Sequence, residues 1–138
     1  MIKPRIAIGL VALWSVAAAQ DMPGKAERYR TMLMKKPENG VLFGRMLDAW
    51  LEERDLAGLK TELERHAEEG NAADWRVLAA FHEHAGNEDE ALKALDKAVG
   101  LAPDDAAARL ARGKAMGAAL RFDDALADLE AAAKDPKL

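Results

Sequence analysis

Apolar residues along most of this chain recur at the three- and four-residue steps of an amphipathic helix. Between Ala91 and Val99, for example, Leu92, Leu95 and Ala98 continue one apolar stripe. No segment alternates between apolar and polar residues in the way of a strand. The pattern predicts an all-α protein with helices at about residues 24–35, 39–53, 56–68, 72–85, 88–100, 105–119 and 122–134.

Polar residues at the predicted helix starts have the side chains that cap helices. Asp55, Asp104 and Asp123 each stand where a carboxylate can accept hydrogen bonds from backbone N–H groups that have no partner within the helix. Asn87 is followed three residues later by Glu90, which is the spacing of a capping box. These residues therefore support the predicted helix boundaries, and the acidic clusters around them need no further explanation.

The chain is similar to itself at a regular interval. Residues 85–99 align without a gap with residues 119–133, so that Ala91 matches Ala125 and Leu95 matches Leu129. Prolines that end apolar stripes recur in step with this interval, at Pro37, Pro103 and Pro136. A helix pair about every 34 residues is the spacing of an α-solenoid, in which each pair is stabilised by stacking on its neighbours.

The middle segment resembles the tetratricopeptide repeat, whose consensus alternates large and small residues at fixed positions. The matching residues are Trp75, Leu78, Ala79, His82, Ala91, Leu95 and Pro103. The resemblance implies a right-handed α-α superhelix of antiparallel helix pairs. It divides the chain into an N-terminal half repeat (20–37) and three repeats at 38–71, 72–105 and 106–138. Small residues are then expected at close helix crossings, with large residues, including Phe122 and Leu129, filling the space beside them.

Residues 1–19 have the three-part pattern of a secretory signal peptide. Lys3 and Arg5 precede an uncharged apolar run, and small residues stand before the predicted cleavage site between Ala19 and Gln20. The apolar run is shorter than the roughly 20 residues that cross a bilayer, so a retained membrane anchor is the less favoured alternative. We therefore expect a periplasmic or secreted bacterial protein that has no membrane contact after cleavage.

Composition excludes several classes of site. The chain has no cysteine, and its formal net charge is −4. Disulfides, thiolate metal sites and cysteine nucleophiles are therefore absent, and a nucleic-acid partner is disfavoured. The basic residues Arg28, Arg30, Lys35 and Lys36 are interpreted as one solvated helix end. No phosphate-binding loop or catalytic constellation is found, so we expect neither an enzyme nor a bound cofactor.

The histidines do not have the spacing of a metal site. His82 and His84 are two residues apart, so on a helix their side chains point about 200° apart and cannot share one metal ion. We expect His82 to be a packing residue and His84 a surface or groove residue. His66 stands alone late in a helix, where its charge would suit the negative helix end. No metal ligand is predicted.

The resemblance implies a function in protein–protein interaction through a concave groove lined by the first helix of each repeat. The implied groove residues are Gly44, Asp48, Leu51, Arg76, Ala80, Glu83, Leu110, Lys114 and Gly117. Arg76 and Lys114 are the only basic residues among them, and we expect them to meet acidic groups of a bound peptide or protein. The alternative is a scaffold segment that self-associates through its alanine-rich last helix, or the first part of a longer array.

Overall fold

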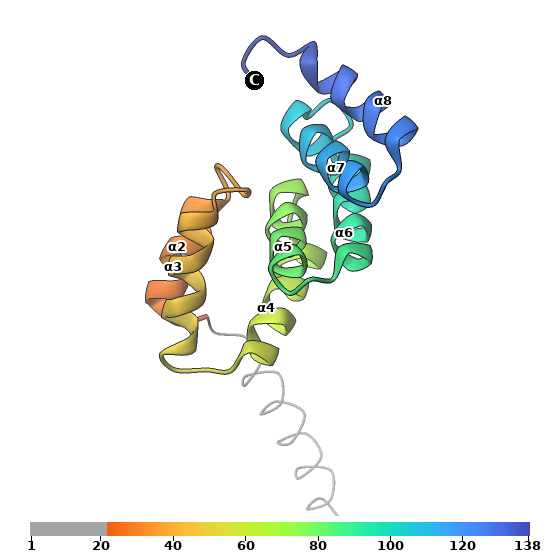
Figure 1. The fold of residues 1–138 in the computed structure, drawn as a ribbon. Helices are drawn as coiled ribbons and strands as arrows, with labels where there is room; N and C mark the ends of the chain where they lie inside the picture. Colours follow the sequence, from red (N-terminus) through yellow and green to blue (C-terminus); the bar gives the residue numbers. More distant parts are fainter. Residues whose placement is uncertain (1–21) are drawn as a thin grey trace, which may run out of the picture.

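The computed structural model describes residues 22–138, and this part of the chain consists of seven α-helices without a strand (Figure 1). The predicted signal peptide, residues 1–19, lies outside the described residues. The helices are α2 (Gly24–Leu33), α3 (Gly40–Leu51), α4 (Leu56–Glu69), α5 (Ala72–His84), α6 (Glu88–Leu101), α7 (Ala106–Ala118) and α8 (Phe122–Ala133). The all-α prediction is confirmed, and the arrangement is that of a solenoid of tetratricopeptide-like helix pairs.

Capping side chains start four of these helices, though not all at the predicted residues. Asp55 accepts a hydrogen bond from the Gly58 amide at 2.7 Å, as expected. A capping box is found at the start of α5, between Asn71 and Asp74, rather than at Asn87. The Asn87 side chain makes no capping bond, because its backbone has ψ 73 instead of the extended value of a capped start.

At the starts of α3 and α7 the caps are Asn39 and Asp105. Asp105 accepts from the backbone amides of Ala107 and Ala108, so the prediction of Asp104 was one residue early. The cap places the Asp105 carboxylate beside the first turn of α7.

Three helix pairs pack closely along their length: α2 with α3, α5 with α6, and α7 with α8. Helix α4 packs on α5, and its backbone approaches α3 much less closely than the members of the three pairs approach each other. In Figure 1, α2 and α3 accordingly stand side by side, apart from the α5–α6 pair. The proposed division of the chain at 38–71, 72–105 and 106–138 stays a prediction.

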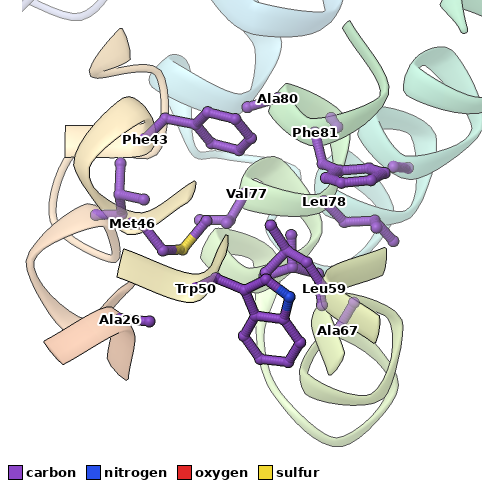
Figure 2. Packing of buried hydrophobic residues seen from close by; sticks show 14 of the residues in the cluster. Ala26, Phe43, Met46, Trp50, Leu59, Ala67, Val77, Leu78, Ala80 and Phe81 are labelled. Atoms are coloured by element: carbon purple, nitrogen blue, oxygen red, sulfur yellow. The ribbon is translucent and has the colours of Figure 1, made fainter. Parts of the chain in front are cut away.

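Side chains of the main core cross the space between α3 and α5. Figure 2 shows Phe43 near Ala80 and Met46 near Val77. Trp50 closes the lower end of this cluster near Leu59, and its indole N–H donates to the Asp55 carbonyl at 2.5 Å. Each fully buried large side chain stabilises the fold by about 1.5–3 kcal/mol. Side-chain packing therefore connects helices whose backbones are not in close contact.

Small residues occupy the close crossings, as expected: Ala91, Ala98, Ala125 and Ala132 are all buried. Leu129 also fills the crossing beside Gly113 of α7, because a Cβ atom at Gly113 would lie only 3.0 Å from the Leu129 side chain. The expectation for Phe122 was wrong, because its side chain is exposed. The reason is tertiary. Within residues 22–138, no helix covers the outer face of α8, on which Phe122 lies.

Candidate functional site

A pocket of about 400 Å³ opens between the α2–α3 turn, α5 and α7; we call it the concave pocket. Apolar residues of α7 line one side, and charged residues of the turn and of α5 line the other. The lining residues are Lys35, Lys36, Glu38, Asn39, Arg76, Ala107, Leu110, Ala111, Lys114 and Leu138. A volume of this size is in the range of sites that hold a few amino-acid side chains or a small molecule.

The structure brings three of the predicted groove residues together in this pocket: Arg76, Leu110 and Lys114. The other predicted residues lie outside its lining. Ala80 is buried, whereas Glu83 is exposed near the end of α5. Asp48 and Leu51 are exposed on α3.

Arg76 holds the walls of the pocket together. Its Nε and Nη2 atoms donate to the two carboxylate oxygens of Glu38 at 2.7 and 2.6 Å. Its Nη1 atom lies 3.4 Å from a carboxylate oxygen of Asp105, the residue that caps α7. One buried guanidinium thus ties the α2–α3 turn, α5 and α7 to each other, a bidentate geometry that lysine cannot reproduce. The sequence did not indicate this structural role.

Three lysines of the concave pocket differ from Arg76 in having exposed side chains without a counterion. Lys35 and Lys36 follow α2, and Lys114 lies on α7. In the part of the chain that the structure describes, none of the three takes part in an ion pair. Because they surround the apolar side chains of Ala107, Leu110 and Ala111, the pocket presents positive charge beside an apolar floor. The sequence predicts only a solvated helix end for Lys35 and Lys36, because the tertiary structure alone brings them into one pocket with Lys114.

The end of α5 carries two further titratable groups on the pocket side of the core. The ring of His84 stacks on Phe43, with centroids 4.3 Å apart, and its Nδ1 atom donates to the Ala80 carbonyl at 2.8 Å. Although Glu83 is exposed, its partial withdrawal from water raises its pKa, and the nearby carboxylate of Glu38 raises that pKa further, against a smaller opposing effect of His84. This end of the helix therefore disfavours additional negative charge.

His82 is a buried packing residue in edge-to-face contact with Phe81, as expected. Burial lowers its pKa, so the neutral ring is favoured. His66 lies on α4, 3.8 Å from the carboxylate of Glu62. Across residues 22–138, no group of three or more histidine, aspartate or glutamate side chains is arranged to hold a metal ion.

A second polar cluster joins α2 and α5, away from the concave pocket. Arg30 donates to both carboxylate oxygens of Glu27 and, at 2.9 Å, to Asp74 of the capping box. The hydrogen bond from Arg30 lowers the pKa of Glu27. The sequence pattern did not predict this contact, because Arg30 and Asp74 are 44 residues apart. The cluster fixes the α2–α3 pair against α5 and thereby positions Lys35 and Lys36.

None of the helices of residues 22–138 is long and apolar enough to span a membrane. A search of curated proteins found no match to this chain. The family model of the tetratricopeptide repeat matches residues 72–115, which comprise α5, α6 and most of α7. Repeats of this family are protein–protein interaction modules. The chain therefore contains a tetratricopeptide repeat, set in an all-helical array of similar helix pairs.

Proposed function

We propose that this protein is an interaction module that binds a segment of another protein in the concave pocket. The observation that carries the proposal is the set of three lysines without counterions, Lys35, Lys36 and Lys114, around an apolar floor. An extended or turn segment with acidic side chains beside an apolar residue has the complementary chemistry. Arg76 contributes by holding the walls in place, because its own charge is already matched by Glu38 and Asp105.

Exposed lysines at the rim of a site contribute more to partner choice and association rate than to affinity. Burial of an apolar side chain against Leu110 and its two alanine neighbours would provide most of the binding free energy. We therefore expect modest affinity that weakens as the salt concentration rises.

The proposal is tested with two short fluorescein-labelled peptides, one alternating glutamate with leucine and one alternating lysine with leucine. Fluorescence anisotropy should show binding of the acidic peptide alone. The double variant Lys36→Glu and Lys114→Glu should weaken that binding at least about tenfold, which corresponds to 1.4 kcal/mol.

The matched control is Lys97→Glu, because Lys97 is an exposed lysine on α6 that does not line the concave pocket. Its variant should bind the acidic peptide as the original chain does. Equal binding of both peptides, or undiminished binding by the double variant, would place the interaction elsewhere. No binding of either peptide would contradict the proposed acidic partner.

We also propose that the protein is exported and acts in the bacterial periplasm or outside the cell. The support is the signal-peptide pattern of residues 1–19, which lie outside the described part of the structure. N-terminal sequencing of the protein recovered from the periplasmic or culture fraction should begin at Gln20. Recovery of a chain with intact Met1 in the membrane fraction would instead support an anchor.

A further inference from the structure

Helix α7 lies antiparallel on α6 in a register that three pairs of residues define. Near one end of the crossing, Leu92 of α6 clusters with Met116 of α7. In the middle, Arg112 of α7 donates to Asp96 of α6 at 3.2 Å. At the other end, Val99 clusters with Ala108. Helix α7 thus presents a small residue, an arginine and a large apolar residue to α6 at four-residue spacing: Ala108, Arg112 and Met116.

Helix α8 repeats the covered face of α6 in the next repeat. Leu92, Asp96 and Val99 correspond to Leu126, Glu130 and Ala133. The exposures differ strongly: Leu92 is 8% exposed, whereas Leu126 is 55% exposed. The face that α7 covers on α6 is therefore present on α8 and lacks a partner within residues 22–138.

The outer face of α8 is more apolar at its N-terminal end than the corresponding face of α6. Leu120 stands where the preceding repeat has Gly86, and Phe122 stands where it has Glu88. Both are large and exposed, at 73% and 65%. Leu120 also has a φ of 63, a left-handed conformation that is unfavourable for leucine. Within the described residues, packing does not explain these two side chains, whereas contact with a partner would.

Charge distinguishes between two possible occupants of this face. Helix α8 contains four acidic residues and no basic one, whereas α7 contains three basic residues and no acidic one. Asp128 is already bound by Arg112 and Arg109. Glu130 has no ion-pair partner in residues 22–138 and corresponds to Asp96, which binds an arginine. Pairing with α8 of a second copy would bring acidic side chains together, so a basic helix is favoured.

We propose that the outer face of α8 (Leu120, Phe122, Leu126, Glu130 and Ala133) binds a basic, alanine-rich helix of a partner protein. The partner helix runs antiparallel to α8. It places a large apolar residue on Leu126, an arginine on Glu130 and a small residue on Ala133. This second surface is separate from the concave pocket, so one chain could hold two partners.

The probe for this proposal is a peptide with the sequence of residues 104–121, because α7 already has the required pattern. A side-chain staple between positions 110 and 114 would keep the peptide helical. Those positions face the concave pocket in the intact chain and leave the pattern of Ala108, Arg112 and Met116 free. Fluorescence anisotropy with the full chain should show saturable binding of this peptide.

Two variants assign the binding to α8. Leu126→Glu should weaken it at least about tenfold, whereas Leu56→Glu, at an exposed leucine of α4, should leave it unchanged. Glu130→Arg should also weaken it, and a peptide with Arg112→Glu should restore binding to that variant. Circular dichroism should show unchanged helicity for each variant, since the substituted side chains are exposed.

Three outcomes would overturn the proposal. The peptide could fail to bind, or it could bind the Leu126→Glu variant as well as the original chain. Thirdly, light scattering could show dimers of the original chain that Leu126→Glu dissociates, and the occupant would then be a second copy. Loss of acidic-peptide binding in the concave pocket would affect only the proposed function, because Leu126 does not line that pocket.

Discussion

Gly86 and Leu120 occupy equivalent turns of successive repeats and have the same left-handed backbone, with φ of 76 and 63. In both turns the amide of the next residue donates to the carbonyl five residues back, at 2.8 and 2.9 Å. This pairing is the C-terminal motif that commonly ends a helix, and it favours glycine at the left-handed position. The second turn therefore adopts the geometry of the first without the residue that fits it best.

Leu120→Gly should stabilise the fold. A left-handed conformation costs a residue with a side chain about 1–2 kcal/mol, and the greater freedom of glycine in the unfolded chain offsets part of the gain. We expect the free energy of unfolding in urea to rise by about 0.5–1 kcal/mol. The reverse change, Gly86→Leu, should lower it. A destabilised Leu120→Gly variant would show that Leu120 makes contacts that outweigh its backbone conformation.

Gly70→Ala should destabilise the protein, whereas Gly100→Ala should not. A Cβ atom at position 70 would lie 2.5 Å from the backbone carbonyl oxygen of His66, which cannot move without disturbing the end of α4. Overpacking of this kind costs about 1–3 kcal/mol. A Cβ atom at Gly100, within α6, would meet no atom within 4 Å, so alanine should raise stability through its higher helix propensity. Thermal unfolding followed by circular dichroism would show opposite shifts of the two melting temperatures.

Arg76→Met should lower the free energy of unfolding by about 1–3 kcal/mol, because it removes a buried charge that binds two carboxylates. We place the effect below that of a fully buried pair, since Glu38 is half exposed. Lys36→Met, in the same pocket but without an ion-pair partner in the described residues, should change stability by less than about 0.5 kcal/mol. Urea denaturation of both variants measures the difference. Equal effects would mean that the Arg76 contacts contribute nothing to stability.

Stability should fall as the pH drops below neutrality. Burial lowers the pKa of His82, and burial together with Arg30 and Arg65 lowers that of His66. The unfolded chain, with histidine pKa values of about 6.5, therefore binds protons before the folded chain does. The free energy of unfolding should be constant above about pH 7.5, decrease as the pH falls through about 6.5, and level off below the folded pKa values.

Replacement of either histidine by glutamine should reduce this dependence, because glutamine does not titrate. Urea denaturation at a series of pH values would measure the slope for His66→Gln, His82→Gln and the original chain. A slope that neither of the first two substitutions reduces would assign the pH dependence to other groups.

Local sequence was sufficient to locate the helices. The three- and four-residue apolar stripes predicted every helix of residues 22–138 to within about two residues. The helix caps were predictable only where neighbouring residues decide them. Asp55 was predicted correctly, because a capping bond connects residues three apart, whereas Asn87 was not, because the preceding turn sets its backbone.

The candidate site was predictable only in part. Spacing along α5 and α7 placed Arg76, Leu110 and Lys114 on helix faces that now line one pocket. It could not indicate that Arg76 binds Glu38, 38 residues away, or that Lys35 and Lys36 stand across from Lys114. These relationships depend on where the α2–α3 pair lies against α5, which contacts distant in sequence determine.

The repeat period, the all-α class and the tetratricopeptide resemblance were properties of the sequence by itself, because helix periodicity and repeat spacing are local signals. Tertiary structure alone decided which equivalent positions are buried. Leu92 and Leu126 have the same place in their repeats, yet Leu92 is buried against α7 and Leu126 is 55% exposed. The physical reason is that burial in a solenoid depends on the next helix in the stack, and a residue's own repeat does not contain that helix.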